Sequence, residues 1–213
     1  MGLPSVFVRV SGCNLRCQWC DTPYASWRPE GENAGVEEIV RRVVAYGCNE
    51  VVITGGEPLI MPEMEHLCYQ LGREGKQITV ETAGTVYATL PVDMVSLSPK
   101  LSHSTPDRVE FAAMAQQHES RRLNLPVLQS FIDTSADIQL KFVIRDRQDL
   151  DEMQGVLDRL RHWRSEDVLL MPEGNAPQVL NERGHWLVDE CRKRGYRFCP
   201  RLHVMLWGNK RGV

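Results

Sequence analysis

Three cysteines near the start of the chain are spaced so that they could hold a metal centre. Cys13, Cys17 and Cys20 form a Cys-x3-Cys-x2-Cys triplet directly after an apolar, strand-like stretch. Structural zinc is bound by four protein ligands, and the sequence offers no fourth cysteine or histidine at a suitable short spacing. Iron–sulfur clusters are held by cysteine thiolates, so three ligands on a four-iron cluster leave one iron free. The spacing therefore favours a cluster with an open iron where chemistry can occur.

Polar and glycine-containing segments follow three further strand-like runs. Thr54-Gly55-Gly56-Glu57-Pro58 ends the first run, and its glycines allow the backbone to approach a ligand closely, although paired glycines also suit an ordinary turn. Glu81 lies at the end of the second run, and Ser98-Pro99-Lys100 lies at the end of the third. A carboxylate can accept a hydrogen bond from a ribose hydroxyl, and a lysine can pair with a carboxylate. We therefore expect a small-molecule site where these strands end.

Strand-like and helical stretches alternate along the chain, which predicts a parallel α/β sheet. The expected strands cover residues 5–10, 50–54, 77–81, 93–98, 138–145 and 167–171. The expected helices cover residues 36–46, 61–74, 107–117, 147–163 and 177–194. Pro126 interrupts the remaining stretch, residues 120–135, which we expect to form a loop over the sheet edge.

The length of the chain limits the sheet to part of a barrel. A complete eight-unit barrel takes about 250 residues, whereas this chain has 213. Right-handed connections would curl the sheet toward a partial, incomplete TIM-like barrel of parallel βα units, with the ligand site at the carboxyl ends of the strands. We expect a single domain over residues 1–213.

Composition and charge argue against two classes of partner. A formal net charge of −3 gives no basic surface for nucleic acid. No apolar run approaches the roughly 20 residues of a membrane span, and the N-terminus lacks the layout of a signal peptide. We therefore expect a cytoplasmic protein with neither nucleic acid nor membrane as its partner.

The seven cysteines suit a reducing compartment, where thiols bind metal or pack as small apolar side chains. Four of them lie outside the triplet and are scattered along the chain. We expect these four to be buried and to bind no metal: Cys48, Cys68, Cys191 and Cys199.

The cysteine triplet, with the aromatic Trp19 between its second and third thiols, resembles the radical S-adenosylmethionine (SAM) superfamily. In that superfamily three cysteines hold a [4Fe–4S] cluster whose open iron binds the amino and carboxylate groups of SAM. Electron transfer from the reduced cluster cleaves SAM and yields a radical that abstracts hydrogen from a substrate. Gly-Gly-Glu-Pro is similar to the second motif of the superfamily, which contacts the SAM amino group. A chance grouping of thiols, or thiols that oxidise in pairs, is the other interpretation.

Several stretches resemble the 7-carboxy-7-deazaguanine synthase family more narrowly. They are Leu3-Pro4-Ser5-Val6-Phe7-Val8-Arg9, Cys20-Asp21-Thr22, residues 52–58, Glu81-Thr82, Ser98-Pro99-Lys100, Arg201-Leu202-His203-Val204 and Trp207-Gly208-Asn209-Lys210. The resemblance implies a lyase that converts 6-carboxy-5,6,7,8-tetrahydropterin to 7-carboxy-7-deazaguanine with loss of ammonia, in queuosine biosynthesis. It also implies Mg²⁺ beside the cluster and SAM, an external flavodoxin-like electron donor and a homodimer.

The resemblance also assigns roles to individual residues. The cluster ligands would be Cys13, Cys17 and Cys20, and Thr22 would supply an oxygen to Mg²⁺, which often takes few protein ligands beside water and substrate. SAM contacts would come from Trp19, Cys20, Asp21, Gly55, Gly56, Glu57, Glu81, Ser98, Pro99 and Lys100. Substrate contacts would come from Arg9, Thr54 and His203. Met171-Pro172-Glu173-Gly174 lies where the family places another SAM contact.

One feature of the family is absent from the sequence. Family members usually begin with a further strand and a Gln-Gly-Glu-Gly segment that recognises the pterin, whereas this chain starts at Met1-Gly2-Leu3-Pro4. We therefore expect effects on substrate affinity and on the closing edge of the barrel. Either the chain is truncated, or another element supplies those contacts, or the enzyme has drifted.

Three other functions stay open at the level of sequence. A glycyl-radical activase shares the cysteine and glycine motifs, but it is not expected to follow its third cysteine with Asp-Thr or to require Mg²⁺. A non-catalytic metal-binding module would use the cysteines for zinc and the glycines for a turn. A degenerate fold kept as an interaction partner would assemble a cluster without cleaving SAM.

Overall fold

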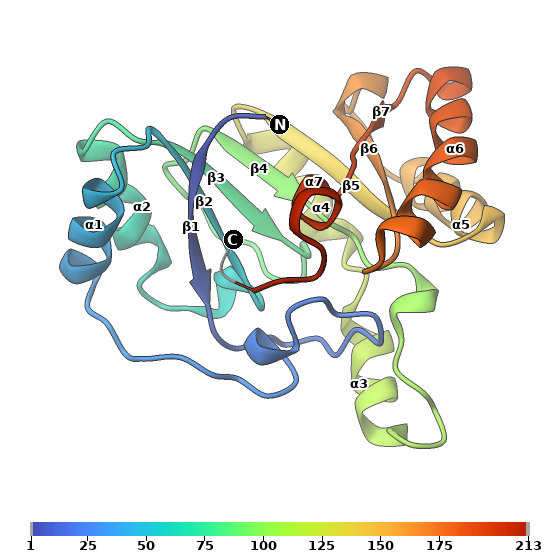
Figure 1. Cartoon of the computed structure of the whole chain (residues 1–213), viewed down its shortest axis with the longest axis horizontal. Coiled ribbons are helices and arrows are strands. Elements are labelled where there is room, and N and C mark those ends of the chain that lie inside the picture. Colours follow the sequence, from blue (N-terminus) through green and yellow to red (C-terminus); the bar gives the residue numbers. More distant parts are fainter. Residues whose placement is uncertain (1, 212–213) are drawn as a thin grey trace.

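The computed structural model describes residues 2–211, which form one parallel sheet with helices packed against it (Figure 1). The strands are β1 (Ser5–Val10), β2 (Glu50–Gly55), β3 (Gln77–Thr82), β4 (Met94–Leu97), β5 (Ile138–Ile144), β6 (Val168–Pro172) and β7 (Arg197–Phe198). They follow one another in chain order, and every neighbouring pair is parallel. Within the described residues β1 and β7 are the two edges, so the sheet is an open, partial barrel, as the sequence predicts.

Four helices contact strands directly, and a fifth, over residues 125–134, joins the same hydrophobic core through Leu128, Phe131 and Ile132. Those in contact with β1, β3, β5 and β6 are, in that order, α1 (Val36–Ala45), α2 (Met64–Arg73), α5 (Arg147–Leu157) and α6 (Pro177–Arg194). The others are α3 (Ala112–Arg121), α4 (Leu125–Thr134) and the short α7 (Leu202–Trp207), which lies in front of the sheet in Figure 1. None of the helices in the described part of the chain is long and apolar enough to cross a membrane.

The strands separate an apolar face from a more polar one, because successive side chains of a strand point to opposite faces of the sheet. Val6, Val51 and Ile53 belong to the hydrophobic core beneath the helices. Arg9 and Thr54 alternate with such residues and are register partners on the opposite, inner face. The inner face therefore presents polar groups close to the carboxyl ends of the strands.

The expected loop over residues 120–135 is wrong, because the structure has helix α4 there. Asn124 caps the helix by accepting a hydrogen bond from Val127 N at 3.4 Å. Pro126 lies in the first turn, where the missing N–H removes no helical hydrogen bond. Pro126 thus lies at the start of a helix, whereas the sequence pattern predicts that it interrupts one.

Other element boundaries differ from the expected ones. Helix α3 starts at Ala112 rather than residue 107, because residues 108–111 form turns. The C-terminal elements β7 and α7 were not expected, since two and six residues are too short to show a periodic pattern.

The cysteines outside the triplet divide into two groups. Cys68 and Cys191 are buried, as expected. Cys48 and Cys199 are only partly buried, so the expectation of burial is wrong for these two. Cys199 directly follows β7, which is an edge strand and so leaves it partly open to solvent.

Candidate active site

The loop that follows β1, residues 11–28, carries the cysteine triplet, and we call it the cluster loop. Gly12 N donates to Ala25 O at 2.8 Å and closes the base of the loop. Farther along, Gln18 N donates to Ser104 O at 2.8 Å, which ties the loop to the 3₁₀ turn that follows β4. These backbone hydrogen bonds hold the loop as a frame for the three thiols.

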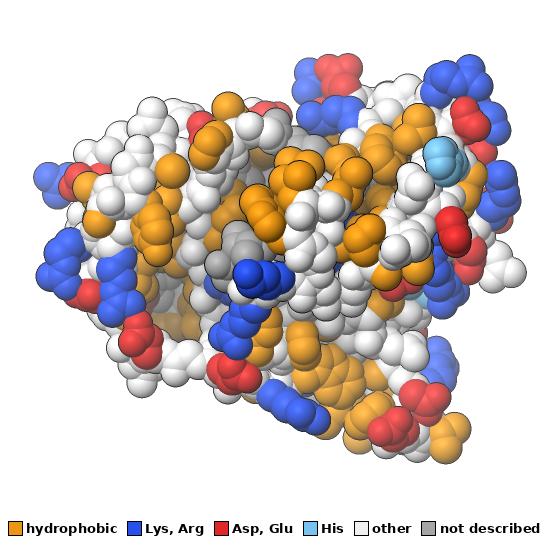
Figure 2. Space-filling view, viewed as in Figure 1, with side chains coloured by type: hydrophobic (Ala, Val, Ile, Leu, Met, Phe, Trp, Pro, Cys, Tyr) orange, Lys and Arg blue, Asp and Glu red, His pale blue; other side chains and the backbone are white. Residues whose placement is uncertain are grey.

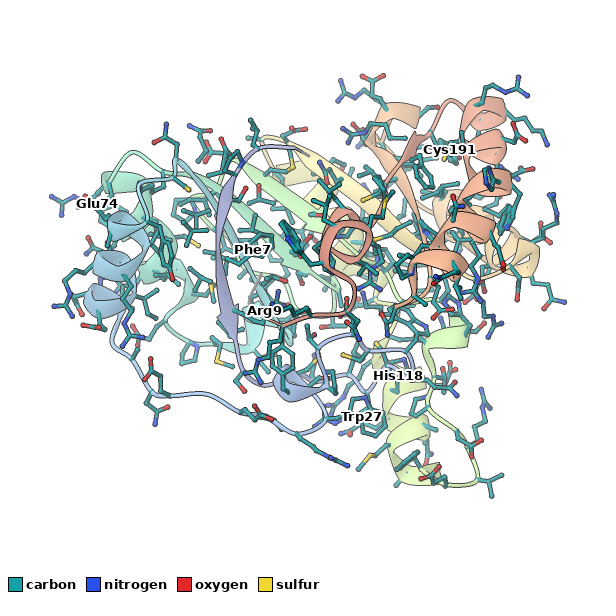
Figure 3. All side chains as sticks on the ribbon, in the orientation of Figure 1. Phe7, Arg9, Trp27, Glu74, His118 and Cys191 are labelled. Carbon is teal, nitrogen blue, oxygen red and sulfur yellow. The ribbon has the colours of Figure 1, made fainter. Side chains whose placement is uncertain are left out.

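A buried histidine supports the same loop from α3. Arg16 N donates to Nδ1 of His118 at 3.1 Å, and Nε2 of His118 lies 2.9 Å from Ser104 Oγ (Figure 3). The Ser104 hydroxyl donates its own hydrogen to Leu101 O at 2.6 Å, so Nε2 must carry the proton that joins it to Ser104. Burial lowers the pKa of His118 to about 4, which keeps the imidazole neutral, as this chain of hydrogen bonds requires.

The three thiols of the cluster loop are free and partly exposed. Burial raises the pKa of Cys17 to about 12, Lys100 opposes that rise, and the nearby Cys20 and Cys13 add to it. Ser26 Oγ lies 3.1 Å from the Cys20 sulfur, and hydrogen bonds to ligand sulfurs tune iron–sulfur clusters. No group of three His, Cys, Asp or Glu side chains in residues 2–211 is arranged to hold a metal ion. In an iron–sulfur cluster each cysteine thiolate binds a different iron, so the thiolates need not converge on one ion. The three separate thiols of Cys13, Cys17 and Cys20 fit such a cluster.

The paired glycines bring the end of β2 against the cluster loop. A side chain at Gly56 would place Cβ 1.9 Å from Gly12 O and 2.5 Å from Ala25 O. At Gly55, where φ is +133°, Cβ would lie 2.1 Å from Val10 O. No residue but glycine fits at either position. The sequence predicts that these glycines let the backbone approach a ligand, whereas the close approach in the structure is to the protein's own backbone.

Glu57 directs its carboxylate into the protein. It accepts hydrogen bonds from Thr82 Oγ1 at 2.7 Å, Ala83 N at 2.8 Å and Leu59 N at 3.2 Å. Burial raises the pKa of this carboxyl, while those three donors oppose the rise. The Glu57 side chain thus joins the ends of β2 and β3.

Polar side chains from neighbouring strands meet on the inner face. Thr54 donates to Oε2 of Glu81 at 3.0 Å, and Lys141 on β5 donates to Oε1. The ammonium group of Lys141 lowers the pKa of Glu81 to about 2, so this carboxylate is ionised. Arg9, the register partner of Thr54 on β1, is exposed on the same face (Figure 3). Together these groups can bind a polar ligand.

The segment after β4 meets the cluster loop, as the sequence predicts. Lys100 Nζ donates to Ser98 Oγ at 2.8 Å and lies 5.7 Å from the centroid of the Trp19 ring. Ser98 and Pro99 are buried, and Lys100 is half-buried. A cation is thus held between the carboxyl end of the sheet and the thiols, where it suits an anionic group of a ligand.

The C-terminal segment closes onto the same region. Arg201 is buried, pairs with the carboxylate of Asp21 in the cluster loop and donates to Gly174 O at 2.7 Å. It therefore links the cluster loop to Gly174, just after the end of β6. Burial and the positive charge of Arg201 lower the pKa of His203, and the charges of Arg9 and Asp21 also act on it. The expected substrate residues His203 and Arg9 are thus close enough for the charge of Arg9 to lower the pKa of His203.

Thr22, the expected magnesium ligand, is half-buried directly before the 3₁₀ turn Pro23–Ala25. Its Oγ1 lies 3.7 Å from the Cys20 sulfur. A threonine hydroxyl oxygen keeps a lone pair for a hard cation even when it donates its hydrogen. This residue therefore fits a magnesium site at the edge of the cluster loop.

Comparisons with known proteins agree with this geometry. Residues 7–115 match the Radical SAM superfamily. A 7-carboxy-7-deazaguanine synthase from Rhodopirellula baltica is 42% identical over 212 residues, which span 100% of this chain and 82% of the relative. The chain belongs to the 7-carboxy-7-deazaguanine synthase family. A second synthase of this family, from Halobacterium salinarum, is 40% identical over 218 residues, covering 98% of this chain and 84% of that protein.

The synthase family lies within the radical SAM superfamily, whose cofactors are a [4Fe–4S] cluster and SAM. A crystal structure of QueE from Escherichia coli shares the fold, with a TM-score of 0.70. It is 21% identical, and the match covers 94% of this chain and 86% of that one. The expected fold class, a partial TIM-like barrel with a radical SAM core, is confirmed.

Two site residues received no role from sequence reasoning. Lys141 interrupts an apolar strand and sits two residues after the polar Gln139, so the period-2 pattern already places both on the inner face. Its partner Glu81 lies 60 residues away in sequence, and no spacing rule links them. Arg201 belongs to a stretch that resembles the family, but its pairing with Asp21 depends on the tertiary fold.

Proposed function

We propose that this protein is a 7-carboxy-7-deazaguanine synthase, a radical SAM lyase that converts 6-carboxy-5,6,7,8-tetrahydropterin to 7-carboxy-7-deazaguanine with loss of ammonia. The observation that carries the proposal is the 42% identity, over the whole chain, to a relative of that name. The geometry supports it, because the cysteine triplet, the glycine motif and the polar inner face meet at one end of an open parallel sheet.

In the proposed site the cluster loop binds the cluster and lies beside the bound SAM. Cys13, Cys17 and Cys20 hold the [4Fe–4S] cluster. Burial raises the pKa of Cys13 and of Cys17 and so favours their protonated thiols, and cluster assembly therefore releases protons and is favoured at higher pH. When bound, the cluster and SAM supply the hydrogen abstraction that starts the reaction. Lys100 is placed to pair with the SAM carboxylate.

The inner face forms the proposed substrate site. Arg9 suits the substrate carboxylate, because a guanidinium binds carboxylate oxygens in a bidentate geometry. The ionised Glu81, held by Thr54 and Lys141, keeps free lone pairs for N–H groups of a ligand. Thr22 would supply an oxygen to Mg²⁺, which when bound would offer a positive charge to the substrate carboxylate.

Further parts of the proposal concern assembly and setting. One hydrophobic core holds the sheet and its helices, which supports a single catalytic domain over residues 1–213. Seven free thiols suit the cytoplasm. We include an external flavodoxin-like electron donor, as the family resemblance implies, and a homodimer formed through exposed apolar residues of α7.

The proposal is tested by anaerobic reconstitution with iron and sulfide, followed by reductant, SAM, Mg²⁺ and the carboxylated tetrahydropterin. Mass spectrometry should detect the deazaguanine and ammonia. The Cys17→Ala variant should make neither, since it lacks a cluster ligand. Cys48→Ala is the matched control, because this thiol lies outside the site and its loss should leave turnover intact. Deoxyadenosine without deazaguanine would refute the substrate assignment, and stoichiometric zinc without iron would refute the radical chemistry.

A further inference from the structure

A buried pair of side chains behind the cluster loop has no part in the site described so far. His103 lies in the 3₁₀ turn Ser102–Ser104, and Asp149 lies in the first turn of α5. Nδ1 of His103 is 2.9 Å from Oδ1 of Asp149, and the side chains are 1% and 4% exposed. The two groups meet at ion-pair distance without the alignment of a hydrogen bond.

Asp149 is fixed by the helix to which it belongs. Its Oδ2 accepts hydrogen bonds from Arg145 N at 2.7 Å and from Asp146 N at 3.1 Å, and the residue completes the capping box of α5. Burial by itself would raise the pKa of Asp149, but His103 and these N–H groups lower it below its ordinary value. Asp149 is therefore a charged and rigid support for His103.

His103 in turn packs on the cluster loop. Its ring stacks on Trp19, with centroids 5.4 Å apart and planes inclined by 22°. Lys100 Nζ lies 5.7 Å from the same indole. Trp19 Nε1 is buried and has no hydrogen-bond partner among the described residues, so ring contacts rather than a hydrogen bond hold this side chain.

We propose that Asp149 and His103 are positioning residues that fix the Trp19 indole and, through it, the part of the cluster loop that carries Cys17 and Cys20. Trp19 lies between these two cysteines in sequence, so a displaced indole would shift both thiols. The chain of contacts runs from the first turn of α5 through the 3₁₀ turn to the loop. The consequence for SAM rests on the proposed function, whereas the consequence for the loop does not.

Two variants separate the contribution of the His103 ring from that of the Asp149 charge. His103→Gln keeps a polar group near Asp149 but removes the ring that stacks on Trp19. Asp149→Asn keeps the ring and an oxygen that can accept the capping hydrogen bonds, but removes the charge. The matched control is Asp133→Asn, because Asp133 forms a similar pair with His162 at 2.8 Å on the exposed surface. Thermal unfolding of all three full-length variants checks that they fold.

The first readout is hydrogen exchange of residues 13–20 in the cluster-free chain. Loss of an aromatic pair should speed exchange in His103→Gln by roughly tenfold, because the loop opens more often. Asp149→Asn should give a smaller increase of about threefold, and Asp133→Asn should match the parent chain. Exchange within twofold of the parent in His103→Gln would overturn the proposal.

The second readout uses the reconstituted enzyme. In His103→Gln the KM for SAM should rise about tenfold while the KM for the pterin stays unchanged, and the electron paramagnetic resonance spectrum of the reduced cluster with SAM should shift. A general loss of fold would raise both KM values and lower the melting temperature. If the parent chain assembles no cluster, the proposed function fails. If the parent assembles one and His103→Gln is indistinguishable from it, this inference fails alone.

Discussion

Glu81 and Lys141 form an ion pair on the inner face, and each residue depends on the other. Burial would lower the pKa of Lys141, but the carboxylate of Glu81 raises it above its ordinary value. Lys141 in turn holds the pKa of Glu81 near 2. The Lys141 side chain is only 14% exposed. If its positive charge were removed, water could compensate the charge of Glu81 only poorly.

Replacing Lys141 with Met keeps the alkyl volume and removes the charge. We expect the variant to lose about 2 kcal/mol of stability at pH 7, since Glu81 is left half-buried without its cation. Because the folded pKa of Glu81 is depressed, the contribution of the pair is present above the unfolded pKa of 4.5 and is lost as pH falls toward 2.

Urea unfolding at several pH values measures this loss. The difference between parent and variant should shrink as the pH falls below 4.5. Gln139→Met is the matched control, because it changes the same face of the same strand without removing a charge, and it should change stability by much less. An equal loss in both variants, or a difference that is constant with pH, would contradict the role of the ion pair.

At the scale of elements, the cluster loop depends on helices that are distant in sequence. α3 contributes His118, which accepts from Arg16 N and donates to Ser104. Protonation would place a hydrogen on Nδ1, facing the N–H of Arg16, and would break that contact. The loop that carries the thiols is therefore sensitive to acid through a residue of α3.

This histidine predicts a pH dependence of stability. Its folded pKa of about 4 lies below the ordinary 6.5, so its contribution is fully present above pH 6.5 and is lost as pH falls through about 4. The shift corresponds to roughly 3 kcal/mol. His118→Gln can keep both hydrogen bonds without titrating, so the variant should lose less stability between pH 7 and pH 4 than the parent. Identical pH profiles from urea unfolding would contradict the assignment.

At the scale of the molecule, apolar side chains gather on the exposed surface of α7. Leu202, Met205, Leu206 and Trp207 are all exposed there, and Figure 2 shows hydrophobic groups across the centre of that face. Contiguous apolar patches on a protein surface commonly mark interfaces. The proposed homodimer would cover this patch, which lies beside the C-terminal contact of Arg201 with the cluster loop.

Replacing Leu206 with Glu should therefore weaken the dimer. In a two-fold dimer the substitution acts twice, so we expect the dissociation constant to rise roughly 100-fold. Light scattering after size-exclusion chromatography should show the molar mass falling toward the 24.3 kDa of one chain. Val109→Glu is the control, because Val109 is a lone exposed residue outside α7. A parent chain that is monomeric would contradict the proposed dimer.

The sequence predicts most of the fold, because six of the strands and most helices have clear periodic patterns and the motifs lie at strand ends. It fails at α4, where a proline at the first turn resembles a helix break, and at β7 and α7, which are too short for periodicity. At the site, local motifs identify the thiols, but contacts between distant segments, such as His103 with Trp19, depend on the tertiary fold.

As a 7-carboxy-7-deazaguanine synthase, the protein should convert a carboxylated tetrahydropterin while SAM is regenerated in each turnover, as the family resemblance implies. The most direct measurement is the ratio of deazaguanine formed to deoxyadenosine released by the reconstituted enzyme, with and without Mg²⁺. We predict many deazaguanine molecules for each deoxyadenosine, and a strong loss of product when Mg²⁺ is removed. Deoxyadenosine released in the presence of the pterin, with no deazaguanine in either condition, would contradict the account.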